Sequence, residues 1–123
     1  RQARGWERAR LMLASAILEK CCHLRLGGLD VFVNFVGGLT VSEPGFDLAV
    51  YAALLSSARN VSLGPSAAFI GEVGLRGQVR STPQVARRVD LARRLGATRI
   101  FVPASCGVNG PDLIRVADLG DLW

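Results

Sequence analysis

The segment spanning residues 71–94, GEVGLRGQVRSTPQVARRVDLARR, most constrains the fold of this chain. Its first residues are typical of a strand that ends in the glycine-flanked turn Gly74-Leu75-Arg76-Gly77. A second extended stretch follows at Val79–Arg80, Pro83 interrupts it, and a helix is expected from about Gln84. The segment therefore predicts a strand, a turn, a strand and a helix in succession, and the chain must combine α and β structure.

Hydrophobic periodicity predicts the remaining elements. From about Trp6 to Cys22, apolar residues recur at three- and four-residue spacing, as in an amphipathic helix. Asp30 to Phe35 alternates strictly, which places Val31, Val33 and Phe35 on one face of a strand and Phe32 and Asn34 on the other. The other expected elements are a helix over Asp47–Ala58, strands over Ala67–Leu75, Thr98–Pro103 and Leu113–Ala117, and the start of a helix at Leu119–Trp123.

Two of these features allow finer predictions. Gly37-Gly38 interrupts an extended run that resumes at Leu39–Val41, so a bulge or a close backbone approach is expected there. The helix over Asp47–Ala58 is apolar nearly all round, which predicts a central helix buried on most sides. In the helix from Gln84, the apolar face carries Val85, Val89 and Ala92, Arg88 lies nearer to it, and Arg87, Asp90, Arg93 and Arg94 lie opposite.

Length and composition indicate one domain, with residues 1–5 as a linker end and residues 6–123 as the domain. The net charge is +5, and Lys20 is the only lysine. Arginine-rich surfaces suit phosphate and carboxylate partners, although arginine bias also follows from a high-GC genome. No apolar run approaches the length of a membrane span. The start at Arg1 rather than at a methionine is typical of a piece of a longer protein.

The cysteines indicate neither a disulfide framework nor a metal site. There are three, and two of them, Cys21 and Cys22, are adjacent. This odd number favours a reducing, cytoplasmic compartment. Cys22-His23 has no second ligand pair at a suitable spacing, and Cys106 stands alone, so no metal is expected.

Two longer stretches carry a family resemblance. Leu24–Val41 (LRLGGLDVFVNFVGGLTV) and Phe69–Ala104, which contains GEVGLRG, closely resemble the C-terminal domain of the RadA (Sms) family of bacterial DNA-repair ATPases. The GEV-x-L-x-G motif is similar to one in the proteolytic domain of Lon-type proteases. The resemblance implies an α/β fold, an α+β sandwich of the Lon proteolytic-domain type, in which a mixed sheet of about four to six strands packs against the central helix and the basic helix.

The family also implies a function for the parent protein. RadA proteins carry a zinc-finger segment and a RecA-like ATPase core upstream, form hexameric rings and drive branch migration of recombination intermediates. ATP, magnesium and zinc would therefore belong to upstream domains and none to this one, and recombinase-type proteins are further candidate partners. No phosphate-binding G-x-x-x-x-G-K-[ST] motif occurs in this chain.

The same resemblance argues against peptidase chemistry. Lon-type catalysis pairs a serine nucleophile with a lysine base, and the matching positions here are Gly45 and Ala86. Gly64-Pro65-Ser66-Ala67 repeats the nucleophile motif, but it precedes a strand rather than a helix, so Ser66 is interpreted as a turn residue. The domain is therefore expected not to be an enzyme.

Binding to the DNA phosphate backbone is the favoured role. The candidate residues are Arg76, Arg80, Arg87, Arg93 and Arg94. Arginines that neutralise phosphates would give salt-dependent affinity without sequence preference. Two alternatives stay open: a purely structural oligomerisation domain, in which these arginines are solvated or paired with Asp90, and an active Ser-Lys peptidase.

Overall fold

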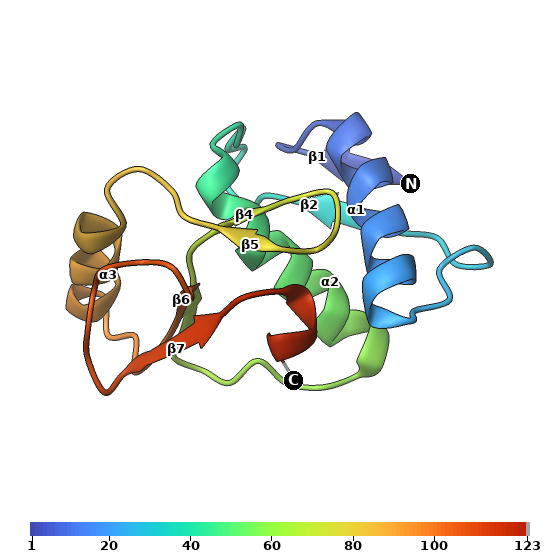
Figure 1. Cartoon of the computed structure of the whole chain (residues 1–123). Helices are drawn as coiled ribbons and strands as arrows, with labels where there is room; N and C mark the ends of the chain where they lie inside the picture. The colour runs from blue at the N-terminus through green and yellow to red at the C-terminus, as the bar shows by residue number, and fades with distance from the viewer. Residues whose placement is uncertain (123) are drawn as a thin grey trace. The chain divides into compact units, whose positions relative to one another are not determined.

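The computed structural model describes residues 1–122 and divides into two compact units, Arg1–Glu43 (unit 1) and Pro44–Trp123 (unit 2). Each unit mixes helices with small sheets (Figure 1), which confirms the α/β class. The two units are described separately.

Unit 1 contains strand β1 (Gln2–Arg4), helix α1 (Arg8–Cys22) and strand β2 (Phe32–Asn34). β1 and β2 pair in parallel, with Gln2 opposite Phe32 and Arg4 opposite Asn34. The predicted helix is confirmed. Its buried residues recur at helical spacing: Leu11, Ala14, Ser15, Ile17, Leu18 and Cys22.

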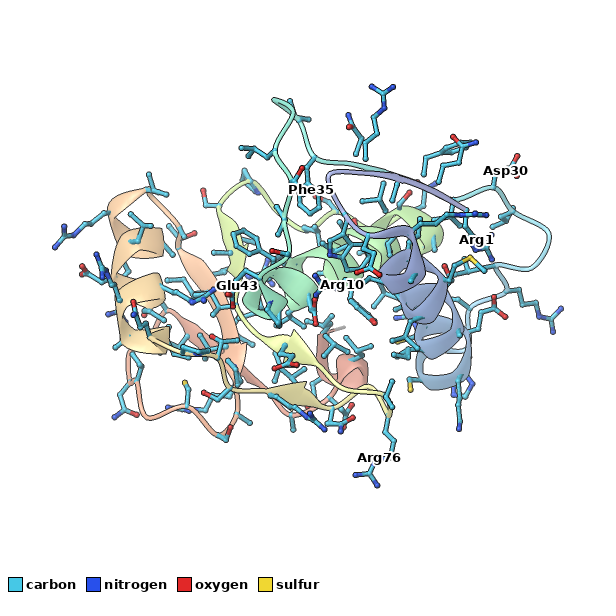
Figure 2. The ribbon with its side chains drawn as sticks, turned by 90° about the horizontal axis from the view of Figure 1, so that it is seen from above. Arg1, Arg10, Asp30, Phe35, Glu43 and Arg76 are labelled. Carbon is cyan, nitrogen blue, oxygen red and sulfur yellow. The ribbon has the colours of Figure 1, made fainter. Side chains whose placement is uncertain are left out.

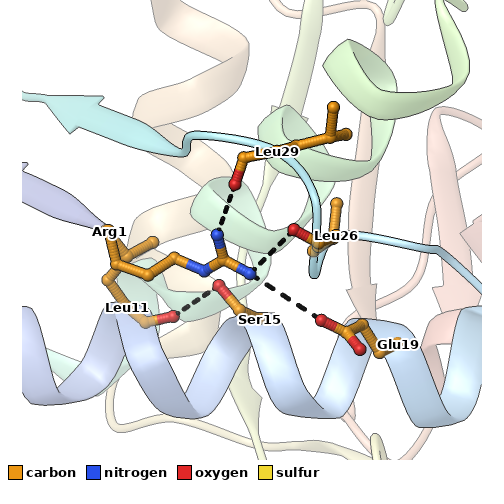
Figure 3. A network of polar contacts seen from close by, with 6 residues as sticks. All are labelled: Arg1, Leu11, Ser15, Glu19, Leu26 and Leu29. Carbon is orange, nitrogen blue, oxygen red and sulfur yellow. Dashed lines mark hydrogen bonds and ion pairs between the residues drawn. The ribbon is translucent and has the colours of Figure 1, made fainter.

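Residues 2–4, expected to belong to a linker end, instead form β1. Gln2 donates a backbone hydrogen bond to Val31 at 2.9 Å, and Arg4 accepts one from Phe35 at 2.9 Å. The Arg1 guanidinium donates to the carbonyls of Leu29 and Leu26 at 2.7 and 3.0 Å and lies 3.8 Å from a carboxylate oxygen of Glu19 (Figure 3). A three-residue strand with two polar residues has no apolar pattern to reveal it, so the sequence could not predict it.

The region after β2 also differs from expectation. The alternation of half-buried and exposed residues along 31–35 is confirmed, but residues 39–41 form no strand. Gly37 and Gly38 have φ angles of 86° and 72°, and a Cβ added to either would meet no atom within 4 Å. The glycine pair therefore serves a left-handed turn rather than a bulge or a close approach.

At Gly5, the backbone after β1 lies close to the backbone of the segment after β2. A Cβ on Gly5 would collide with the carbonyl oxygen of Leu39 and lie 2.9 Å from the Cβ of Phe35. The Gly5 carbonyl accepts a hydrogen bond from Val41 at 2.6 Å. Gly5 thus fixes the segment after β2 against the segment after β1.

Unit 2 is built around a parallel sheet. The strands β3 (Ala67–Phe69), β6 (Arg99–Pro103) and β7 (Leu113–Val116) form a three-stranded sheet in the order β3-β6-β7. The strands β4 (Glu72–Val73) and β5 (Val79–Arg80) form a separate antiparallel hairpin. The helices of unit 2 are η1 (Pro44–Phe46), α2 (Asp47–Arg59), α3 (Val85–Arg94) and η2 (Leu119–Leu122), and the last residue of the predicted helix Leu119–Trp123 lies outside the described residues.

The expectation of one sheet with four to six strands was wrong, because the predicted strand Ala67–Leu75 is two strands. Its middle residue, Gly71, bonds to the η1–α2 junction: it donates to Gly45 at 3.1 Å and accepts from Leu48 at 3.0 Å. A Cβ on Gly71 would lie 2.8 Å from Val79. The chain therefore leaves the β3 ladder before it enters the hairpin.

The two long helices of unit 2 bury different fractions of their surfaces. Val85 and Val89 of α3 join Ile70, Ile100, Val102 and Cys106 in one hydrophobic cluster. Arg88 is half-buried, as expected, whereas Arg87, Arg93 and Arg94 are exposed.

In α2, the buried residues are Asp47, Leu48, Val50, Tyr51, Ala52 and Leu55. Ala53 and Ser57–Arg59 are exposed, so the prediction of burial on most sides was too strong.

Candidate nucleic-acid interface

The β4–β5 hairpin presents Arg76 at its tip. Gly77 donates to the Gly74 carbonyl at 2.9 Å and Gly74 donates to the Gln78 carbonyl at 2.8 Å, which closes the predicted turn. The backbone N–H of Arg76 donates to the side-chain oxygen of Gln78 at 2.9 Å. The Arg76 side chain extends away from the ribbon (Figure 2). A tight turn fixed at three points thus holds an exposed guanidinium on unit 2.

Arg80 lies on the second strand of the same hairpin. It is exposed, and its register partner on β4 is the half-buried Glu72. Residues directly opposite each other in a ladder share one face of the sheet. The charge of Arg80 is therefore partly offset by a carboxylate on its own face.

Helix α3 presents Arg87 and Arg94 on the side opposite its buried valines. The two are seven residues apart, which is close to two full helical turns. Arg94 forms an i,i+4 ion pair with Asp90 at 3.0 Å, and both side chains are largely exposed. Such exposed pairs contribute little to stability, so Arg94 can exchange this partner for another anion.

Arg93 differs from Arg94 in the partner of its guanidinium group. Its Nε donates to Oδ2 of Asp112 at 2.7 Å, its Nη2 donates to Oδ1 at 2.9 Å, and Nη2 also reaches the Asn109 carbonyl at 3.4 Å. This bidentate contact raises the pKa of Arg93 and lowers that of Asp112. Arg93 therefore connects α3 to the segment before β7, and its guanidinium already has an anionic partner.

Two other arginines have structural contacts. Arg88 donates to the Pro83 carbonyl at 3.0 Å, next to the start of α3. Arg115, which the sequence reasoning missed, donates to the carbonyls of Cys106 at 2.8 Å and Val108 at 2.5 Å and to the Asn109 side chain at 3.1 Å. It fixes the segment between β6 and β7. The sequence places Arg115 inside a predicted strand, but this position does not indicate which carbonyl groups its guanidinium contacts.

The positions expected to match the Lon-type dyad lie on two helices. Gly45 is buried in η1, directly before α2. Ala86 is exposed in the first turn of α3. Ser66 lies in the turn before β3, as predicted, and its carbonyl accepts hydrogen bonds from Thr98 and Arg99 at 2.9 and 3.3 Å. Lys20 belongs to α1 of unit 1.

Two further observations concern residues 1–122. None of the helices there has the length and hydropathy needed to cross a membrane. That part of the chain also holds no group of three or more histidine, cysteine or acidic side chains arranged to bind a metal ion.

A family model described as ChlI, subunit ChlI of Mg-chelatase, matches residues 11–106. The chain belongs to this family. The match to ChlI covers most of α1, both strands of the hairpin and the whole of α3, so it includes all five candidate arginines.

Curated relatives of this ChlI-family chain are named DNA repair protein RadA. The chain is 38% identical over 122 residues to the protein of Brucella abortus (strain 2308), a match that covers 96% of this chain and 26% of the relative. It is 39% identical over 126 residues to the protein of Bacillus subtilis (strain 168), covering 98% and 28%. The protein of Streptococcus pyogenes serotype M6 is 36% identical over 118 residues, covering 94% and 26%.

The chain thus spans about a quarter of the length of these relatives. The relatives confirm the similarity to RadA proteins. The Lon-type architecture stays a prediction.

Proposed function

We propose that the chain is a catalytically degenerate, Lon-protease-like domain of a RadA-type DNA repair ATPase. In this proposal it helps to assemble a hexameric ring and contacts the phosphate backbone of DNA during branch migration. The observation that carries the DNA contact is the exposure of Arg76, Arg80, Arg87 and Arg94 on unit 2. Arg93 is given a structural role because Asp112 already occupies its guanidinium.

The relatives support the repair role over the chelatase role in the family's name. They match 94–98% of this chain under one name, DNA repair protein RadA. Segment 76–94 also contains six arginines and one acidic residue, Asp90. Such a balance suits a polyanion. The affinity for DNA would fall as the salt concentration rises, because the release of condensed counterions from the DNA then becomes less favourable.

The absence of peptidase activity is part of the proposal. Glycine at position 45 has no nucleophile, and alanine at position 86 has no base. We expect no casein cleavage and no labelling by a serine-reactive phosphonate. Covalent labelling of Ser66, or of any other serine, would contradict this part.

The DNA contact is tested with the chain alone. Fluorescence anisotropy with a labelled duplex, repeated across a salt series, gives the slope of log affinity against log salt. We expect Arg76→Ala with Arg80→Ala, and Arg87→Ala with Arg94→Ala, each to reduce that slope by roughly one unit per lost phosphate contact. The paired control, Arg25→Ala with Arg59→Ala, changes the charge equally at exposed positions outside the hairpin and α3 and is expected to keep the slope. Equal slopes for all of these proteins would contradict the proposal.

One observation favours the structural alternative. Leu91 of α3 and Leu95, the residue that caps the end of this helix, are 56% and 80% exposed and lie on the same side as Arg87 and Arg94. Exposed leucines between arginines are also typical of a subunit contact. In that case the α3 arginines would hold a neighbouring subunit rather than DNA.

A further inference from the structure

Unit 1 contains a groove that the proposed function does not use. It has a volume of about 700 Å³ and lies along β1 and β2. This volume falls within the range of about 300–1,000 Å³ that is typical of ligand sites. Its lining includes Arg1, Arg4, Arg8, Phe32 and Asn34, and none of its lining residues is acidic.

The β1–β2 ladder determines what the groove displays. Both strands alternate as exposed, half-buried, exposed. Because Gln2 is paired with Phe32, and Arg4 with Asn34, the exposed residues form one continuous face. That face carries an aromatic ring, a guanidinium and two carboxamides.

Phe32 is an unusual residue for such a position. Its side chain is 66% exposed on a polar face. The adjacent Val33 is half-buried on the opposite face, so the strand has an apolar side chain available for packing without Phe32. An exposed ring on a short sheet offers a flat surface on which a base can stack.

The arginines of the groove differ in whether their guanidinium groups can bind an anionic ligand. Arg1 is bound to the carbonyls of Leu26 and Leu29 and lies near Glu19 (Figure 3). Arg8 donates from Nε to the Arg1 carbonyl at 3.2 Å, which orients its terminal nitrogens without using them. Arg4 is exposed on the ladder face. Arg1 therefore acts as a fixed support, and Arg4 and Arg8 supply the donors for an anion.

We infer that this groove binds a short stretch of single-stranded nucleic acid. Phe32 stacks on an unpaired base, Arg4 and Arg8 contact the flanking phosphates, and Asn34 donates to or accepts from a base edge. A duplex cannot use this arrangement, because its bases are already stacked on one another. The inference goes beyond the proposed function, which concerns arginines of unit 2, and does not depend on it.

A length series of labelled oligothymidine tests the ligand class, by anisotropy with the 123-residue chain. We expect affinity to rise from thymidine monophosphate to an oligomer of roughly four to eight nucleotides and to exceed that for a duplex of equal length. A monophosphate that binds as tightly as the oligomer would assign the groove to free nucleotides. A duplex that binds better than the single strand would overturn the stacking role.

Substitutions locate the site. We expect Phe32→Ala and Phe32→Leu to weaken single-strand binding by roughly 5- to 100-fold, while Phe32→Tyr stays close to the parent. Arg4→Ala should weaken binding and reduce its salt dependence. The matched controls are Val36→Ala and Arg25→Ala, which are exposed in unit 1 but do not line the groove.

Two results would overturn the inference: parent-like binding by Phe32→Ala and Arg4→Ala, or an equal loss in the two controls. Melting temperatures of all variants verify that they fold, and Phe32→Tyr and Phe32→Leu retain the bulk of the side chain if Phe32→Ala does not fold.

Arg87→Glu with Arg94→Glu separates the two proposals. This double variant should lose duplex affinity under the proposed function. Adding Phe32→Ala to it should still weaken single-strand binding by the same factor as in the parent.

Discussion

At the scale of single residues, the arginines of this chain divide by their partners rather than by their positions in the sequence. Arg93 and Arg94 are adjacent, but Arg93 binds Asp112, which lies before β7, and Arg94 pairs with Asp90 on its own helix. The sequence gives both residues the same helix face. Asp112 is 19 residues away from Arg93, and only the folded segment before β7 brings the two together.

The Arg93–Asp112 contact predicts a pH-dependent stability. The hydrogen bond from Arg93 lowers the pKa of Asp112 below its ordinary value of 3.8. The unfolded chain therefore binds this proton more readily, and the stabilisation is complete above that value and lost as the pH falls through the lower, folded pKa. We expect Asp112→Asn to lower the urea midpoint at about pH 7, and this difference from the parent to shrink below about pH 4.

Asp90→Asn is the control for this prediction. Asp90 also pairs with an arginine, but its contact is an exposed i,i+4 pair. We expect only a small change in its urea midpoint. If Asp112→Asn had the same midpoint as the parent at neutral pH, the contact would be only a surface pairing.

Thr82 gives a second prediction at this scale. It is 7% exposed, and its hydroxyl has no hydrogen-bond partner among residues 1–122. A buried polar group without a partner costs free energy. We expect Thr82→Val to raise the free energy of unfolding by about 1 kcal/mol, with Thr82→Ala as the comparison that also removes volume. A loss of stability in Thr82→Val would show that the hydroxyl has a partner, such as an ordered water.

At the scale of elements, the sequence predicted the long and strongly patterned segments well. The helices α1, α2 and α3, the hairpin turn and the strands β6 and β7 all lie close to their expected bounds. β1 was missed because it is short and polar. The split of Ala67–Leu75 was missed because its cause is the contact of Gly71 with η1 and α2, far away in the sequence.

Helix α2 supplies a prediction about burial. Leu55 is 1% exposed, whereas its neighbour Leu54 is half-buried. Removing a fully enclosed leucine side chain leaves a cavity, so Leu55→Ala should reduce the free energy of unfolding by about 2–5 kcal/mol. We expect Leu54→Ala to cost clearly less. Similar losses at both positions, measured by denaturant unfolding, would mean that α2 is enclosed on more sides than the structure shows.

At the scale of the whole molecule, sequence reasoning gave the fold class and the similarity to RadA proteins but not the sheet architecture. Pairing between strands depends on long-range contacts that periodicity does not encode. The candidate site was predictable in part. The charge of segment 76–94 is visible in the sequence, whereas the contacts of Arg88, Arg93 and Arg115 and the groove of unit 1 form only when the chain folds.

The central claim is that the exposed arginines of α3 contact DNA phosphates. The most direct test is to introduce Arg87→Glu with Arg94→Glu into the full-length parent protein and to measure duplex affinity across a salt series together with the oligomeric state. We expect weaker binding, a smaller slope of log affinity against log salt by roughly one unit per lost contact, and intact rings. Unchanged affinity and slope, with rings that dissociate into monomers, would contradict the claim and assign these arginines to a subunit interface.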